Sequence, residues 1–265
     1  MDDVINNLPE SIRNLTEGKP FETNDFGKSG SLVRVYDDFV LKVEKERPQI
    51  AQMVEVMRWL EGKLPVPKIL AAEVKDGYRY LLMSKVRGRM ACDEYYMNRP
   101  EELVTLLAEA LRMLASIDIS DCPKTFDLEA ELAEAKYRIE NNLVDYEDME
   151  PETFGEGGFK DPQALLQWLD DHKPVPEPVL SHGDFCLPNV FFEEGKVSGF
   201  IDLGDAGIAD RWYDIALGYR SLKHNADGTY GKTYEGVNPD ELFAKLSIEP
   251  DWEKIRYYIL LDELY

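Results

Sequence analysis

Hydrophobic and polar residues alternate over several short segments near the start of the chain, as expected of strands with one buried face. Turn residues join these segments in pairs, which predicts two β-hairpins, formed by residues 31–36 with 39–43 and by residues 69–74 with 78–83. Between the hairpins, apolar residues recur at helical spacing from Pro48 to about Glu61. Residues 1–86 are therefore expected to form a β-rich N-terminal lobe with one helix.

Beyond this region the apolar pattern becomes helical. The clearest case is the segment Pro100–Ile117, whose leucines form one stripe along an amphipathic helix. Other helices are expected over residues 128–143, from Asp161 to about Asp171, from Asp210 to about Leu222, after Asn238, and from Asp251 to the end of the sequence. One hairpin, residues 190–193 with 196–202, interrupts them. Residues 87–265 are therefore expected to form a mainly helical C-terminal lobe, which makes the chain an α+β protein.

The composition excludes several classes of protein. Hydrophobic residues make up 44% of the 265 residues, which is enough for a buried core, and no apolar run is long enough to cross a membrane. The 30 basic and 52 acidic residues give a net charge of −22, which repels nucleic acids and anionic membranes and attracts cationic ligands, although acidity also serves solubility alone. The N-terminal segment lacks the order of a signal peptide and the three cysteines are widely spaced, so we expect a cytoplasmic protein.

Two polar motifs in the C-terminal lobe carry residues that phosphoryl transfer from ATP requires. They span Ser181–Asn189, with the sequence SHGDFCLPN, and Phe200–Gly204, with the sequence FIDLG. Such a reaction needs a carboxylate to orient the acceptor hydroxyl, oxygen ligands for Mg²⁺ and a cation for the donor phosphates. Asp184 can supply the first, Asn189 and Asp202 the second, and Lys42 of the β-rich lobe the third. Each feature alone is as easily a surface turn or a solvated strand residue, and it is their order and spacing that favour a kinase.

With these motifs and several longer blocks, the sequence resembles the aminoglycoside 3'-phosphotransferases, antibiotic-resistance kinases whose fold is similar to that of protein kinases. The blocks that carry the likeness are Trp59–Lys68, Ser116–Pro123, His182–Asn189, Lys196–Gly204, Ala209–Ala216 and Tyr257–Tyr265. The resemblance implies a bilobal protein-kinase-like fold that uses ATP and Mg²⁺. It also implies that the protein transfers the γ-phosphoryl group of ATP to the 3'-hydroxyl of an aminoglycoside, and that this transfer gives resistance to the drug.

The resemblance also implies roles for individual residues. Asp184 matches the catalytic aspartate, Asn189 and Asp202 match the metal ligands, and Lys42 matches the phosphate-binding lysine. The other matched positions are Ser29 and Gly30 in the loop that closes over the phosphates, Val40 beside the adenine, and Asp262, Glu263 and the carboxylate of Tyr265, which would hold the ammonium groups of the drug.

The acidic residues suggest a second part of the drug site. Aminoglycosides carry several ammonium groups, and acids that converge on one cleft attract such a ligand. The acidic segment 145–156, which includes Glu147 and Glu150, is therefore a candidate wall of the site, with a solvated surface loop as the alternative. We expect an aminoglycoside as the partner, no nucleic acid, no membrane, and a monomer or weak homodimer.

Two positions depart from the family pattern. Met53 stands where the family has a helix glutamate that pairs with its lysine, and Glu55, two residues on, faces about 200° around the helix. Val40 replaces the aromatic residue that stacks on the nucleotide, so adenine packing would be aliphatic or would use Phe39. Two alternatives therefore stay open: a kinase of another small cationic or alcohol substrate, and a ligand-binding homologue with weakened catalysis.

Overall fold

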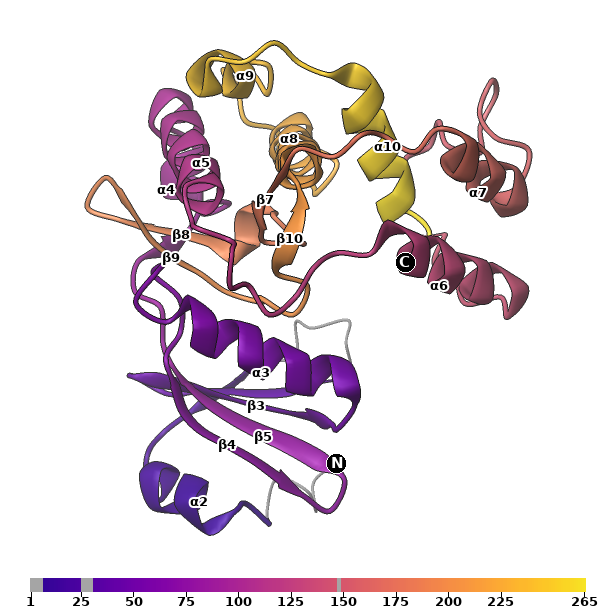
Figure 1. The fold of residues 1–265 in the computed structure, drawn as a ribbon. Helices are drawn as coiled ribbons and strands as arrows, with labels where there is room; N and C mark the ends of the chain where they lie inside the picture. Colours follow the sequence, from indigo (N-terminus) through magenta and orange to yellow (C-terminus); the bar gives the residue numbers. More distant parts are fainter. Residues whose placement is uncertain (1–6, 25–30, 147–148) are drawn as a thin grey trace.

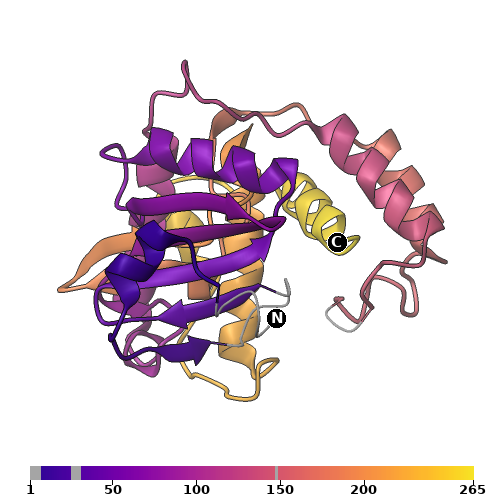
Figure 2. The ribbon, with the colours of Figure 1, turned by 90° about the horizontal axis from the view of Figure 1, so that it is seen from below.

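The protein, described by a computed structural model over residues 7–24, 31–146 and 149–265, begins with a five-stranded antiparallel sheet (Figures 1 and 2). The strands, in the order β1-β2-β3-β5-β4, are β1 (Glu22–Asn24), β2 (Leu32–Val35), β3 (Phe39–Lys45), β5 (Tyr78–Ser84) and β4 (Ile69–Lys75). Within the described residues, the helices α2 (Glu10–Thr16) and α3 (Pro48–Leu60) accompany the sheet. Both predicted hairpins and the helix predicted from Pro48 are confirmed.

Alternation along β3 gives this sheet two different faces. Phe39, Leu41 and Val43 are buried on one face, in an apolar cluster that includes a residue of α2. Val40 and Lys42 lie on the other face, because successive strand residues point to opposite sides. Figure 1 shows α3 on the side of the sheet that faces the rest of the chain, with α2 on the far side. The alternation thus turns Lys42 towards the C-terminal part of the protein.

The remainder of the chain is mainly helical, as predicted, and its described residues include two small antiparallel sheets. One sheet joins β6 (Arg89–Met90), β8 (Val190–Glu193) and β9 (Lys196–Phe200), and the other pairs β7 (Pro178–Ser181) with β10 (Gly207–Asp210). The helices are α4 (Glu94–Met97), α5 (Pro100–Ala115), α6 (Leu128–Glu140), α7 (Pro162–Asp171), the 3₁₀ turn η1 (Leu187–Asn189), α8 (Arg211–Asp227), α9 (Glu241–Leu246) and α10 (Trp252–Asp262). Within the described ranges, no helix combines the length and the apolar character needed to cross a bilayer.

Aspartate side chains set where several of these helices begin. Asp161, Asp210 and Asp251 each accept a hydrogen bond from a backbone N–H of the first turn, as the sequence predicts. Several helix ends differ from the prediction. α8 runs past Leu222 and stops before Gly228, whose φ of 99° suits glycine, whereas α6 ends at Glu140 and α10 at Asp262, before the predicted ends at residues 143 and 265. The last turns of α8 are polar, so the apolar pattern ends earlier than the helix does.

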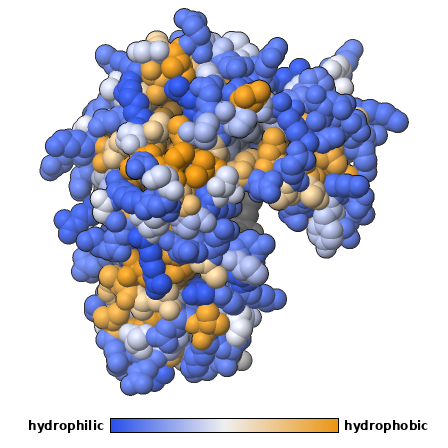
Figure 3. Space-filling view, viewed as in Figure 1, coloured by the Kyte–Doolittle hydropathy of each residue, from blue (hydrophilic) through white to orange (hydrophobic). Residues whose placement is uncertain are grey.

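The C-terminal part places two helices away from its centre. α8 packs against α10 and α5, and α10 in turn contacts α7. α6 and α7 pack against each other and form an arm beside α10 (Figure 2). Figure 3 shows the surface hollowed between this arm and the part of the molecule that holds the N-terminal sheet. The division into lobes at residue 86, between β5 and β6, stays a prediction.

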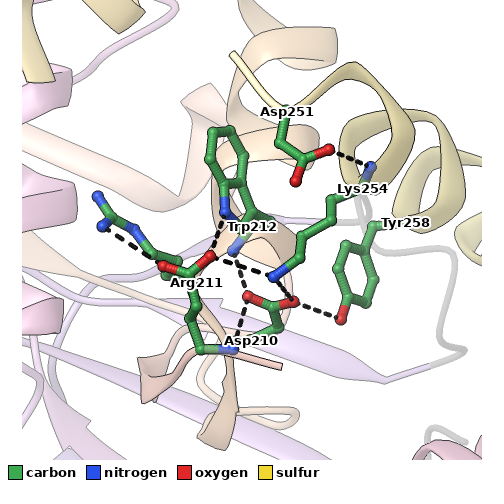
Figure 4. A network of polar contacts seen from close by, with 7 residues as sticks. Asp210, Arg211, Trp212, Asp251, Lys254 and Tyr258 are labelled. Atoms are coloured by element: carbon green, nitrogen blue, oxygen red, sulfur yellow. Dashed lines mark hydrogen bonds and ion pairs between the residues drawn. The ribbon is translucent and has the colours of Figure 1, made fainter. Parts of the chain in front are cut away.

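A network of polar contacts, with Asp210 buried at its centre, ties α10 to the start of α8 (Figure 4). The Asp210 carboxylate accepts a hydrogen bond from the Tyr258 hydroxyl at 3.0 Å and lies 3.1 Å from the Lys254 ammonium group. Lys254 Nζ is also 3.1 Å from Glu177 Oε1, which accepts a hydrogen bond from the Trp212 indole at 3.0 Å. Because the charges are shared among several partners, the network holds α10, and the acidic residues at its end, at a defined place beside α8.

Candidate active site

The loop after β7 carries the first motif, and a buried carboxylate holds its backbone. Asp214 of α8 accepts hydrogen bonds from the Ser181 hydroxyl at 2.8 Å and from the backbone N–H groups of His182 and Gly183 at 2.6 and 3.1 Å. Burial raises the pKa of Asp214, while these hydrogen bonds act in the opposite direction. Asp214 thus braces the loop from the following helix.

His182 connects the first motif to the second. Its Nε2 lies 2.9 Å from the carbonyl oxygen of Ile201, and its Nδ1 lies 3.3 Å from the backbone nitrogen of Asp184. A carbonyl oxygen only accepts and an N–H only donates, so the ring carries its proton on Nε2 and accepts on Nδ1. The ring is fully buried. His182 is therefore structural and holds the backbone of the loop.

Gly183 allows the two motifs to approach closely. Its φ is +82°, and a Cβ atom at this position would lie 2.4 Å from the carbonyl oxygen of Asp205. Both the backbone conformation and the space therefore require glycine. The approach brings the loop that carries Asp184 against the loop that carries Asp202.

Asp184 and Asn189 contact each other within the first motif. The Asn189 side-chain amide donates to the carbonyl oxygen of Asp184 at 3.0 Å and to its carboxylate at 2.8 Å. Burial raises the pKa of Asp184, and the negative charges of Asp262 and Asp202 raise it further, whereas the hydrogen bond from Asn189 lowers it. Asp184 is therefore a half-buried carboxylate within electrostatic reach of two other acids.

Asp202 and Lys42 meet at the other side of this group. Asp202 follows β9 with a φ of 55°, and its carboxylate lies 3.5 Å from the Lys42 ammonium group on β3. The backbone N–H of Ile201 donates to the carbonyl oxygen of Asn189 at 3.0 Å, which joins the two motifs directly. The structure therefore brings Asp184, Asn189, Asp202 and Lys42 together from segments far apart in the sequence.

The oxygen atoms of this group suit a magnesium ion. Mg²⁺ prefers carboxylate, amide and phosphate oxygens, and it is usually held by one or two protein groups together with substrate phosphates and water. Asn189 donates through its amide nitrogen, which leaves the amide oxygen as a ligand, and Asp202 supplies an exposed carboxylate. Over the described ranges, no group of three or more His, Cys, Asp or Glu side chains could hold a metal. The donor set thus fits Mg²⁺ completed by phosphate rather than a closed metal cage.

The structure describes some of the residues expected around the adenine and the phosphates. Val40 is half-buried on the Lys42 face of β3, paired with Met83 of β5. Phe39 points to the opposite face and belongs to the cluster with α2, so the alternative that it packs on the adenine is wrong. Ser29 and Gly30 lie outside the described residues.

The C-terminal acid Asp262 forms an ion pair that the sequence analysis did not anticipate. Asp262, at the end of α10, pairs with Arg220 of α8. Burial lowers the pKa of Arg220, but the charge of Asp262 and its hydrogen bond outweigh this effect, so the pKa is raised. Arg220 is one basic residue within a helix of mixed polarity, and only its place in the fold shows that it meets Asp262.

The other predicted drug-binding acids contact different parts of the C-terminal region. Glu263 is buried and accepts a hydrogen bond from the backbone N–H of Glu150 at 3.2 Å. Glu150 Oε1 lies 2.7 Å from His224 Nε2, and the hydrogen bond from His224 lowers the pKa of Glu150. The Tyr265 hydroxyl donates to a carbonyl oxygen of α6 at 2.6 Å. Glu147 lies outside the described residues, so the structure brings Glu150 and Glu263 together and sets Tyr265 against the arm.

Cys186 lies in the same loop as Asp184. Burial raises the pKa of its thiol, and the negative charge of Asp184 raises it further. The thiol therefore keeps its proton at neutral pH and is a poor nucleophile. Cys186 is therefore a packing residue of the loop.

Comparisons with known proteins agree with this geometry. A family model described as the phosphotransferase enzyme family matches residues 24–257. An aminoglycoside 3'-phosphotransferase of Enterococcus faecalis is 46% identical over 233 residues, which cover 87% of this chain and 81% of that protein. One of Niallia circulans is 36% identical and both chains are covered completely.

Solved structures show the same fold. The crystal structure of an aminoglycoside-3'-phosphotransferase of type VIII has a TM-score of 0.78 at 26% identity, covering 100% of this chain and 99% of the other. An aminoglycoside phosphotransferase of Streptomyces rimosus, solved with ADP and streptomycin, has a TM-score of 0.80 at 24% identity over 96% of each chain. The predicted protein-kinase-like fold is thereby confirmed. Because both the family model and these relatives cover most of the chain, the protein belongs to the aminoglycoside 3'-phosphotransferases of the phosphotransferase enzyme family.

Proposed function

We propose that this protein transfers the γ-phosphoryl group of ATP to the 3'-hydroxyl of an aminoglycoside antibiotic and thereby gives resistance to the drug. The observation that carries the proposal is the meeting of Asp184, Asn189, Asp202 and Lys42 around one point. The relatives named above supply the substrate class, since those that cover most of the chain are aminoglycoside 3'-phosphotransferases.

In this proposal Asp184 acts on the acceptor. Its carboxylate accepts a hydrogen bond from the drug hydroxyl and takes up the proton as the hydroxyl oxygen bonds to the γ-phosphorus. The bond between the γ-phosphorus and the bridging oxygen breaks, and ADP leaves. The hydrogen bond from Asn189 at 2.8 Å keeps the carboxylate in place, so positioning provides much of the rate.

The donor side is held by charge. Lys42 binds the α- and β-phosphates, with Val40 beside the adenine and the loop of Ser29 and Gly30 over the γ-phosphate. Asn189 and Asp202 hold Mg²⁺, which neutralises charge on the phosphates when it is bound. The nucleotide then lies between an N-terminal lobe of residues 1–86 and a C-terminal lobe of residues 87–265.

The drug is held by acids of the C-terminal region. Asp262 lies near enough to Asp184 for its charge to raise the pKa of that carboxyl, so an ammonium group bound at Asp262 would be in the same region as the reacting hydroxyl. Glu147, Glu150, Glu263 and the carboxylate of Tyr265 would supply the remaining negative charge. Each exposed ion pair adds at most about 1 kcal/mol, so affinity comes from several pairs acting together.

A direct test is phosphate transfer from ATP to kanamycin, with the site of phosphorylation located by NMR. The wild-type protein is expected to phosphorylate the 3'-hydroxyl. Asp184→Asn keeps the size of the side chain and should abolish turnover while ADP still binds, as measured by calorimetry. Wild-type rates for Asp184→Asn would refute the role of Asp184, and transfer only to non-aminoglycoside alcohols would refute the substrate class.

A further inference from the structure

Glu44 is an acidic residue of β3 that lies beside Lys42. We propose that Glu44 positions Lys42 for the phosphates of ATP, a task that in protein kinases falls to a glutamate on a helix. This inference rests on the proposed function, because it refines how the same site holds its nucleotide. Glu44 would act through Lys42 and is therefore a positioning residue.

The strand itself places the two side chains together. Lys42 and Glu44 are two residues apart, so they lie on the same face of β3. The Lys42 ammonium group is 3.8 Å from Glu44 Oε1. Exposure is 18% for the Lys42 side chain and 7% for Glu44, so water screens this pair much less than a surface pair.

The surroundings of Glu44 identify Lys42 as the cation that compensates the charge of its buried carboxylate. Glu44 Oε1 is fully buried, and no hydrogen-bond donor reaches it from the described residues. A buried carboxylate oxygen is costly unless a positive charge compensates it. In the described part of the chain, Lys42 is the cation within 4.0 Å of this carboxylate. The position of Glu44 is thus accounted for by its attraction to Lys42.

The other anionic neighbour of Lys42 has a second task. Asp202 lies 3.5 Å from Lys42, but its side chain is 55% exposed and belongs to the proposed Mg²⁺ site. A carboxylate bound to Mg²⁺ attracts a lysine less, because the metal neutralises its charge. Glu44 has no such competing role and can hold Lys42 while the nucleotide is bound.

The helix beside the sheet does not provide an alternative. α3 contains a single acidic residue, Glu55, which is exposed. The residue of α3 that faces the second motif is Met53, whose sulfur would lie 3.9 Å from a Cβ atom on Gly204. The anionic partner of Lys42 has therefore moved from the helix to the strand.

Glu44→Gln tests this role, because it removes the charge and keeps the size of the side chain. We expect about a tenfold loss of affinity for MgADP, measured by calorimetry without drug, and about a tenfold rise in KM for ATP. KM for kanamycin should be unchanged. Glu55→Gln, which removes an exposed acid from α3, is the matched control and should bind MgADP like the wild type. If Glu44→Gln does not fold, Glu44→Asp tests the distance instead, because it keeps the charge but withdraws it from Lys42 by one methylene; it should also weaken MgADP binding, and wild-type affinity would overturn the inference.

A double-mutant cycle separates positioning from a general structural effect. If Glu44 acts through Lys42, then Lys42→Met and the double variant Lys42→Met with Glu44→Gln bind MgADP equally. Wild-type affinity in Glu44→Gln, or a further loss in the double variant, would overturn the inference. A wild-type protein that phosphorylates no aminoglycoside would refute the proposed function instead, since the binding cycle is measured without drug.

Discussion

Removal of the Lys254 ammonium group should destabilise the protein strongly, because it leaves a buried carboxylate without its cation. Lys254 Nζ lies 3.1 Å from Asp210 Oδ2 and 3.1 Å from Glu177 Oε1, and the Asp210 side chain is only 1% exposed. Burial by itself lowers the pKa of Lys254, but hydrogen bonds to both acids outweigh it and the pKa is raised. Lys254→Met keeps the aliphatic part of the side chain and removes only the charge.

The size of the effect follows from what remains around Asp210. Breaking a buried ion pair costs about 3–5 kcal/mol. Asp210 keeps hydrogen bonds from Tyr258 at 3.0 Å and from the backbone N–H groups of Trp212 and Glu177 at 3.2 Å, so we expect the lower value. At about 2.1 cal/mol/K per residue, a chain of 265 residues unfolds with an entropy of about 0.56 kcal/mol/K. A loss of about 3 kcal/mol therefore lowers Tm by about 5 °C.

Calorimetry or circular dichroism measures this shift, and two variants serve as controls. Lys136→Met removes an exposed pair with Glu140 on α6, separated by 4.0 Å, and should change Tm by less than about 1 °C. The double variant Lys254→Met with Asp210→Asn removes the uncompensated charge and should recover part of the loss. A Tm for Lys254→Met as close to the wild type as that of Lys136→Met would refute the reasoning.

Two other single positions give further predictions. Gly183→Ala should lower the unfolding free energy by about 2 kcal/mol or more, because the added Cβ would lie 2.4 Å from the carbonyl oxygen of Asp205. Gly195→Ala is the control: Gly195 also has a positive φ, +73°, but its Cβ would lie in open space, so the unfolding free energy should fall by only about 1 kcal/mol. Equal losses in thermal unfolding would contradict this. Two hydrogen bonds from Arg79, at 2.8 and 2.6 Å, lower the pKa of Glu46 in the folded protein. The pair therefore stabilises the protein fully when the pH is above the pKa of glutamate in the unfolded chain, about 4.3. This stabilisation is lost as the pH falls through the lower pKa of Glu46 in the folded protein. The Tm difference between wild type and Glu46→Gln should therefore shrink below about pH 4, and a constant difference from pH 7 to 3 would refute this.

Short-range patterns determined much of the fold. The two hairpins of the sheet, helix α3 and the stripe of α5 follow from apolar spacing over a few turns or one strand pair. The aspartates before α7, α8 and α10 mark where these helices begin, because a cap acts on the N–H groups of its own first turn. The short elements β1, β7, β10 and α2 were not predicted, since three to seven residues carry too little periodicity to distinguish them from loops.

Local patterns also identify the chemical groups of the candidate site. The spacing of Asp184 and Asn189 within one loop, the position of Asp202 after a hairpin and the position of Lys42 in a predicted strand are all local properties. Which side chains face these groups depends on the packing of distant segments. Arg220 meets Asp262 only in the folded chain, and only the fold buries the Glu44 carboxylate beside Lys42.

Sequence patterns could not predict these contacts, because an ion pair depends on distance in space and on the exclusion of water, whereas a sequence pattern records distance along the chain. Asp214 illustrates this difference, because its buried carboxylate reaches Ser181, His182 and Gly183 across more than thirty residues of sequence. Strand alternation could place Lys42 and Glu44 on one face. Only the packing of that face shows that Glu44 is buried, that Met53 of α3 faces the second motif, and that Lys42 lies within reach of Asp202.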